Sequence, residues 1–131
     1  MKSFDFSNDT LLLAEDNETN RLFVEATLKD TGITILYAGN GREAIKLFKQ
    51  YNEIDIVLMD AVMPQSSGFD ATIAMKKINP NVPVIMLTAY PGSESFAKSL
   101  SSGCNDFLSK PIEPDVLLAV LKKWLTSVSS K

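Results

Sequence analysis

Three acidic residues, one hydroxyl and one lysine each stand at the end of a short apolar segment of the chain: Glu15, Asp16, Asp60, Thr88 and Lys110. In an open parallel sheet, ligands bind outside the carboxyl ends of the strands, so side chains placed in this way would meet at one edge. Three carboxylates held together repel one another and have raised pKa values unless a cation lies between them. Mg²⁺ suits such a group, because it binds one or two carboxylates and keeps waters and phosphate oxygens as further ligands.

The lysine and the threonine add what a phosphoryl group requires, since an ammonium and a hydroxyl can hold its oxygens. Taken singly, an acidic residue at a strand end is often only solvated or caps the next helix, and Asp16 could do no more than that. A shared site is predicted because all five residues lie at the ends of predicted strands. The pattern therefore predicts Mg²⁺-dependent phosphoryl chemistry, with Thr88 and Lys110 beside the phosphoryl oxygens.

Five apolar segments rich in β-branched residues alternate with segments of helical periodicity. We predict strands over residues 10–14, 33–38, 54–59, 83–88 and 106–109. The intervening helices are predicted to begin near Asn17, Gly41, Gly68, Ser93 and Glu113. Nearly continuous apolar strands indicate a parallel sheet covered on both faces, and the alternation predicts a doubly wound α/β fold.

The same pattern predicts a single domain over residues 1–131, because no linker and no repeat divides the chain. Its core is expected over about residues 9–125. The segments 1–8 and 126–131 are expected to be frayed ends.

The composition excludes several classes of site. The chain has 131 residues, a net charge of −3, no histidine and one cysteine, Cys104. Without histidine, most zinc sites, Ser-His-Asp hydrolases and phosphohistidine carriers are excluded. The acidic balance without a basic cluster argues against direct nucleic-acid binding, and no apolar run approaches the ~18 residues of a membrane span. A lone cysteine is typical of a reducing compartment, so we expect a cytoplasmic protein without direct membrane contact.

Several short motifs occur in a fixed order: Leu11-Leu12-Leu13-Ala14-Glu15-Asp16-Asn17, Leu58-Met59-Asp60 with Met63-Pro64, Gly68, Leu87-Thr88-Ala89, and Gly103 followed by Asp106-Phe107-Leu108-Ser109-Lys110-Pro111. Each motif is modest alone, but their order and spacing are specific. Over essentially residues 9–125 the chain resembles the receiver (response regulator) domain family of two-component signalling. The resemblance implies a flavodoxin-like three-layer sandwich with five helices and a five-stranded sheet in the order 2-1-3-4-5.

The resemblance also implies the roles of the site residues. Asp60 would accept a phosphoryl group from a phosphohistidine on a histidine kinase or a histidine phosphotransfer domain. Asp16 and Asp60 would bind Mg²⁺ directly, Glu15 through water, and Val62 through its backbone carbonyl. Thr88 and Lys110 would contact the phosphoryl oxygens. Together with Asp60 they would be the catalytic residues. The Lys110–Pro111 peptide bond would be cis, which X-Pro bonds tolerate.

In the family, Thr88 and Phe107 would form a switch pair that changes the face made by helix four, strand five and helix five. This face is where output partners or a second copy in a dimer would bind. Phe107 replaces a tyrosine common in the family, so it would act by packing alone. The helix predicted over 93–102 contains several serines, which form helices only moderately well, and we expect phosphorylation to order or shift it.

The chain is thus predicted to be a phosphorelay switch with self-directed phosphoryl transfer, not an enzyme acting on external substrates. The segments 15–21 and 109–112 are most similar to receivers of hybrid histidine kinases, although a free-standing regulator remains an alternative. Two other classes also remain open: a phosphohydrolase that forms an aspartyl phosphate, and a pseudo-receiver or FMN-binding protein. The first usually needs an acid where Val62 stands, and Glu15-Asp16 would repel an FMN phosphate.

Overall fold

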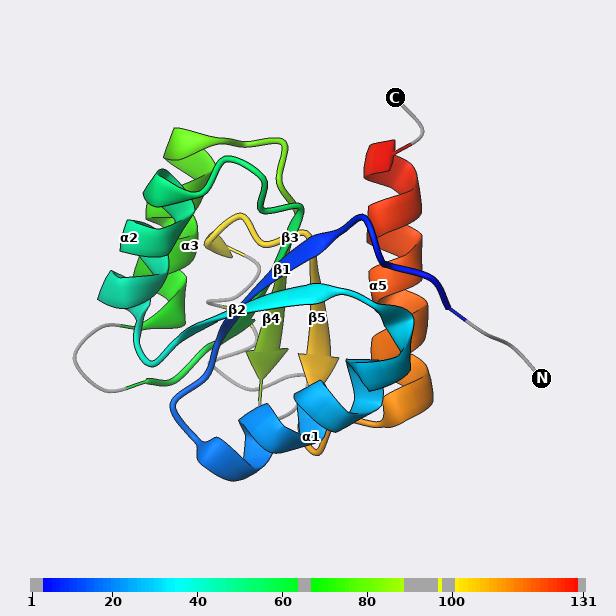
Figure 1. Ribbon diagram of the computed structural model, residues 1–131. Coiled ribbons are helices and arrows are strands. Elements are labelled where there is room, and N and C mark those ends of the chain that lie inside the picture. Colours follow the sequence, from blue (N-terminus) through cyan, green and yellow to red (C-terminus); the bar gives the residue numbers. More distant parts are fainter. Residues whose placement is uncertain (1–3, 64–66, 89–96, 98–100, 130–131) are drawn as a thin grey trace.

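The computed structural model describes residues 4–63, 67–88, 97 and 101–129 (Figure 1). At its centre lies a parallel sheet of five strands in the order β2-β1-β3-β4-β5. The strands are β1 (Thr10–Ala14), β2 (Thr34–Ala38), β3 (Ile56–Asp60), β4 (Val84–Thr88) and β5 (Asp106–Ser109). The predicted strand order is confirmed.

Four α-helices are described, namely α1 (Glu18–Leu28), α2 (Gly41–Gln50), α3 (Gly68–Ile78) and α5 (Pro114–Ser129). The first three begin where a side-chain oxygen caps the helix: Asn17 accepts from the Asn20 N–H, Asn40 from the Glu43 N–H, and Ser67 from the Asp70 N–H. Such caps satisfy one of the amide groups left free in the first turn.

A single glycine, Gly32, marks the end of the helical segment that begins with α1. After Leu28 a short 3-10 turn (Lys29–Thr31) leads to Gly32, whose φ of 79° is left-handed and therefore favours glycine. Gly32 thus ends the helical segment one turn beyond its last α-helical residue.

The helices cover both faces of the sheet and give three layers, with α1 and α5 on one face and α2 and α3 on the other (Figure 1). Alternate residues of β1 supply the two cores: Leu11 and Leu13 pack on the α1/α5 side, Leu12 and Ala14 on the α2/α3 side. The three leucines are fully buried, and each contributes about 1.5–3 kcal/mol relative to an exposed leucine. This two-sided burial explains why the strands are apolar without alternation.

The register of the sheet brings strand ends together at one edge. Ala14 of β1 pairs with Met59 of β3, so Glu15 and Asp60 follow side by side. Thr88 of β4 lies one residue beyond Leu87, the partner of Asp60, and pairs with Ser109, the residue before Lys110. Strand pairing alone therefore carries the predicted site residues to the same edge.

The two segments expected to be frayed ends are more ordered than predicted where the structure describes them. Phe6, placed by sequence in a frayed end, is 5% exposed in the α1/α5-side core, and its N–H donates to the Thr31 carbonyl. The backbone remains helical to Ser129. The helix predicted over 93–102 lies largely outside the described residues and stays a prediction.

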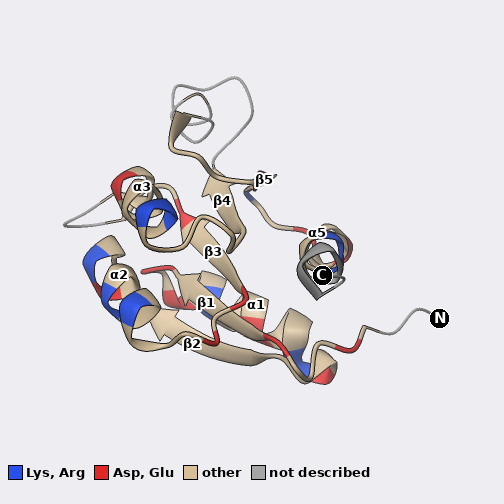
Figure 2. Ribbon diagram, turned by 90° about the horizontal axis from the view of Figure 1, so that it is seen from above, with Lys and Arg blue, Asp and Glu red and all other residues tan. Residues whose placement is uncertain are grey.

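Charged residues are distributed over the helices on both sides of the sheet. Lys and Arg segments are visible on α2 and α3 and also on the opposite layer, interspersed with acidic segments (Figure 2). Within the described part of the chain, no helix has the length and apolar character needed to cross a membrane.

Candidate functional site

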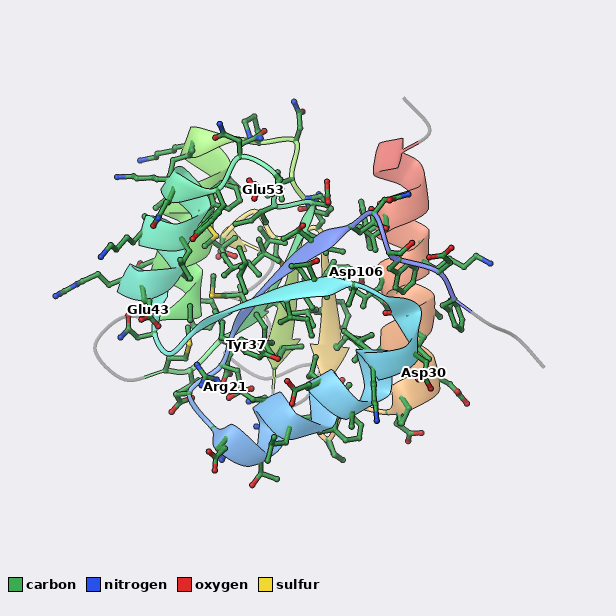
Figure 3. The ribbon with its side chains drawn as sticks, viewed as in Figure 1. Arg21, Asp30, Tyr37, Glu43, Glu53 and Asp106 are labelled. Carbon is green, nitrogen blue, oxygen red and sulfur yellow. The ribbon has the colours of Figure 1, made fainter. Side chains whose placement is uncertain are left out.

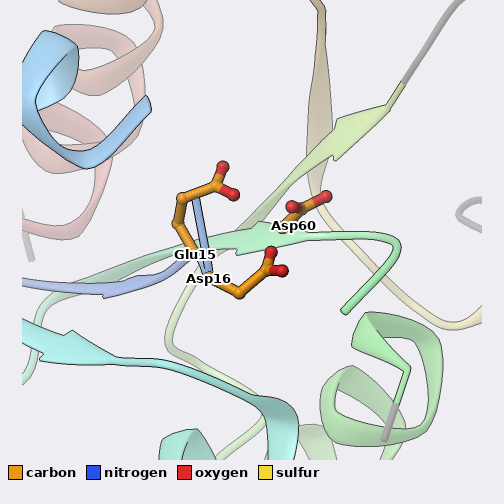
Figure 4. A group of neighbouring side chains, drawn as sticks. All are labelled: Glu15, Asp16 and Asp60. Atoms are coloured by element: carbon orange, nitrogen blue, oxygen red, sulfur yellow. The ribbon is translucent and has the colours of Figure 1, made fainter. Parts of the chain in front are cut away.

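Three carboxylates converge at the carboxyl edge of the sheet (Figure 4). Glu15 and Asp16 follow β1, Asp60 ends β3, and one oxygen from each side chain lies within 4.8 Å of the others. Glu15 is 1% exposed and Asp60 is 3% exposed, whereas Asp16 faces solvent. The convergence predicted from strand ends is therefore present.

Lys110 supplies the positive charge beside this acidic cluster. Its Nζ lies 3.0 Å from Asp60 Oδ1 and 3.8 Å from Glu15 Oε1. The Lys110 N–H donates to the Thr88 carbonyl, and the Lys110–Pro111 peptide bond is cis, as the resemblance implied. The lysine therefore contacts the predicted acceptor directly and is anchored to the strand that ends in Thr88.

The surroundings of Glu15 raise the pKa of its carboxyl group. Burial raises its pKa to about 7, and the nearby Asp60 carboxylate acts in the same direction. A hydrogen bond from the Asn17 N–H and the charge of Lys110 lower the pKa only in part. One ammonium is thus not enough to neutralise the site.

Two buried oxygens at this edge lack hydrogen-bond partners among the described residues, Glu15 Oε1 and Thr88 Oγ1. Buried polar atoms nearly always form hydrogen bonds, so two that form none at this edge of the sheet indicate a place for a ligand. Carboxylate oxygens are hard ligands of the kind that Mg²⁺ prefers, and a threonine hydroxyl can donate a hydrogen bond to a phosphoryl oxygen. The residues present therefore fit a divalent cation and a phosphoryl group.

The remaining predicted residues surround the cluster. Val62 donates its N–H to Asp60 Oδ1 at 3.2 Å, and its side chain is 69% exposed. Phe107 is half-buried against the α2/α3-side core and pairs in the sheet with Met86, two residues before Thr88. All predicted site residues thus lie at or near one edge of the sheet.

Sequence reasoning missed the backbone supports of the site. The Arg21 Nε donates to the Glu15 carbonyl at 2.9 Å. Gly68 had been noted only as part of a motif, yet a Cβ at this position would overlap the Asp60 carbonyl oxygen and approach Met59 Cγ to 3.0 Å. A glycine as the first residue of a buried helix could have indicated such a close approach.

The comparisons with known proteins agree on one family. A profile of the response regulator receiver domain matches residues 11–122. The chain belongs to the response regulator receiver domain family. Proteins of this family act as signalling switches, so membership favours this interpretation over the phosphohydrolase and flavin-binding alternatives.

Among curated relatives, hybrid signal transduction histidine kinase B of Dictyostelium discoideum is 37% identical over 131 aligned residues. The match covers 89% of this chain but only 7% of that kinase. The chain thus spans a small part of the relative, and the activity of the longer protein is not transferred with it.

Two solved structures are similar throughout the fold. The receiver domain of sensor histidine kinase PA1611 from Pseudomonas aeruginosa, with a magnesium ion in its active site cleft, has a TM-score of 0.85 and 30% identity. This match covers 91% of the present chain and 98% of that one. The receiver domain of Saccharomyces cerevisiae Ssk1, crystallised with the histidine phosphotransfer protein Ypd1, has a TM-score of 0.86, 27% identity and coverages of 95% and 92%.

Proposed function

We propose that residues 1–131 act as one receiver domain in which Asp60 accepts a phosphoryl group in a Mg²⁺-dependent reaction. The observation that carries the proposal is the position of Asp60: its carboxylate is buried, lies within the acidic cluster, and has Lys110 Nζ at 3.0 Å. A nucleophilic carboxylate with a cation site on one side and an ammonium on the other is suited to phosphoryl transfer.

The acidic cluster would hold the cation. Asp16 and Asp60 would bind Mg²⁺ directly, Glu15 through water, and Val62 through its backbone carbonyl. Bound there, Mg²⁺ would offset negative charge on the phosphoryl oxygens. Glu15 Oε1 accepts no hydrogen bond from the described residues, and the pKa of Glu15 is raised despite Lys110 nearby; both support this assignment, because both indicate a need for more positive charge.

The chain's own residues would perform the transfer. An Asp60 carboxylate oxygen forms a bond to phosphorus while the phosphorus–nitrogen bond to the donor imidazole breaks, with its electron pair returning to the nitrogen. Lys110 then shifts from the carboxylate to a phosphoryl oxygen, and the unpaired Thr88 hydroxyl donates to another. The buried position of Asp60 limits the access of water to the acyl phosphate.

The signal would be read through the switch pair. Movement of Thr88 toward the phosphoryl group leaves space into which the Phe107 ring can turn, and this changes the face formed by the predicted fourth helix, β5 and α5. We expect the segment 93–102 to be ordered or shifted by the event, and a dimer to use the same face. Hydrogen exchange with and without a beryllofluoride mimic tests this, and unchanged protection there would contradict it.

The donor would be a histidine kinase or a histidine phosphotransfer domain. The Ypd1–Ssk1 complex supports a partner of this kind, since its receiver has the same fold. The similarity to hybrid kinases supports an origin within a longer kinase chain. A cytoplasmic location remains a prediction from the cysteine content.

Incubation with acetyl phosphate, with and without Mg²⁺, tests the proposal by intact mass spectrometry. The wild type should gain the mass of one phosphoryl group only when Mg²⁺ is present, and Asp60→Asn should gain none. Asp55→Asn is the matched control, because Asp55 lies just before the opposite end of this strand, where its carboxylate accepts the Thr10 N–H at 2.8 Å. An adduct that persists in Asp60→Asn, or disappears in Asp55→Asn, would contradict the assignment.

A further inference from the structure

Arg21 connects the first helix to the backbone beneath the acidic cluster. It lies in the first turns of α1, and its Nε donates to the Glu15 carbonyl at 2.9 Å. Its guanidinium carbon lies 5.5 Å from the centre of the Tyr37 ring on β2, and the two side chains are neighbours in Figure 3. The guanidinium is therefore held between the helix and the ends of β1 and β2.

The bonded carbonyl belongs to the peptide unit that joins Glu15 to Asp16. Because a peptide unit is planar, fixing its oxygen also fixes the direction in which the chain enters Asp16. The amide of Glu15 is held as well, since its N–H donates to the Ala38 carbonyl at 3.0 Å. Both ends of the Glu15 backbone are thus restrained, one by β2 and the other by Arg21.

Glu15 and Asp16 differ in the contacts that hold their carboxylates. The Glu15 carboxylate is buried and accepts the Asn17 N–H at 3.2 Å. The Asp16 carboxylate faces solvent, and among the described residues no hydrogen bond to it is found. Its place in the cluster therefore depends on the backbone alone, and Arg21 holds the carbonyl next to it.

We propose that Arg21 is a positioning residue for the cation site, which fixes the Glu15–Asp16 peptide so that the Asp16 carboxylate is directed at Mg²⁺. This inference rests on the proposed Mg²⁺-dependent function and adds to it a residue that touches neither metal nor phosphate. Supports of this kind typically contribute about 10- to 100-fold to metal affinity.

When Arg21 is replaced, the loss of its charge and the loss of its positioning role should change the affinity for Mg²⁺ in opposite directions. A positive charge close to the cluster repels Mg²⁺, so its removal would by itself tighten binding. Loss of the hydrogen bond to the Glu15 carbonyl leaves Asp16 free to turn away and weakens binding. A substitution that removes both charge and donor therefore separates the two roles by direction.

Titration calorimetry of the unphosphorylated protein with Mg²⁺ alone provides the test. Arg21→Met, which keeps the length of the side chain, should raise the dissociation constant about tenfold or more. Arg21→Lys keeps the charge but lacks the fixed Nε–H, and should weaken binding several-fold. Tyr37→Phe is the matched control, because it retains the ring under the guanidinium and loses only the hydroxyl bond to Glu25; its affinity should equal that of the wild type.

A double-mutant cycle identifies the ligand through which Arg21 acts. In the Asp16→Asn background, Arg21→Met should change the affinity far less than in the wild type, because the carboxylate that it positions is already lost. Equal or tighter binding by Arg21→Met, or fully additive effects in the cycle, would overturn the role of Arg21. Failure of the wild type itself to bind Mg²⁺ would instead overturn the proposed function and, with it, this role.

Discussion

The buried Glu15 predicts that the metal-free protein is destabilised as pH rises. In the unfolded chain this acid ionises near pH 4.5, whereas burial and the Asp60 carboxylate raise its pKa in the folded protein to about 7. Between these values the folded state binds more protons than the unfolded state, so the free energy of unfolding falls with increasing pH. The penalty is absent below the lower pKa and complete above the higher one.

The size of this effect follows from the pKa difference. Each pKa unit corresponds to about 1.4 kcal/mol, so a rise from 4.5 to about 7 implies a loss of up to about 3 kcal/mol at pH 8. Glu15→Gln keeps the shape of the side chain and an oxygen that can accept the Asn17 N–H, but it cannot ionise. The variant should therefore be the more stable protein at pH 8, by about 2–3 kcal/mol.

Urea unfolding in EDTA between pH 5 and 8, followed by the fluorescence of the single tryptophan, Trp124, measures this difference. The wild type should lose stability over this range relative to Glu15→Gln, and the difference reports the titration of Glu15 together with its coupling to the Asp60 carboxylate. Added Mg²⁺ should reverse the order at pH 8, since only the wild type keeps the full acidic cluster.

The exposed Glu53 provides the matched control, and Glu53→Gln should follow the wild type at every pH. Equal pH dependence of the wild type and Glu15→Gln without metal would refute the argument. So would a Glu15→Gln protein that is less stable than the wild type at pH 8 in EDTA.

Two further predictions concern one close contact at the site and one hydrogen bond at the opposite edge of the sheet. Gly68→Ala should cost about 1–3 kcal/mol and slow phosphorylation, because the new methyl group overlaps the Asp60 carbonyl. Gly39→Ala, whose Cβ would lie 3.6 Å from its nearest neighbour, Glu43 Oε1, should change neither unfolding nor phosphoryl uptake, and equal behaviour of the two variants would contradict this view. Trp124→Phe should lose about 1 kcal/mol in urea unfolding followed by circular dichroism, since it removes the 2.9 Å bond from the indole N–H to Asp106; no loss would show that this bond is not stabilising.

The fold was largely predictable because its signals are local. Strands buried on both faces need continuous apolar residues, and helix starts need capping oxygens at Asn17, Asn40 and Ser67, so both are visible in the sequence. The acidic cluster was predictable for a related reason. In a parallel sheet, strand ends meet at one edge whatever the details of packing, so Glu15 and Asp60 had to approach each other.

What the sequence could not supply are contacts between distant elements. The Lys76 Nζ donates to the Val82 carbonyl at 2.9 Å and also to Asn105 Oδ1, and both acceptors lie outside its own helix. Trp124 is half-buried against the α1/α5-side core, and its indole N–H donates to Asp106 Oδ2. Such bonds depend on how helices α3 and α5 are docked, and no spacing along the chain specifies this.

The central claim is that Asp60 is the phosphorylated residue, and mapping of the modified position tests it most directly. After incubation with acetyl phosphate and Mg²⁺, borohydride reduction should convert the acyl phosphate to homoserine, which peptide mass spectrometry can locate. We expect conversion at Asp60 and at no other acid, Glu15 and Asp16 included. Conversion at a different residue, or none in a protein that binds Mg²⁺, would contradict it.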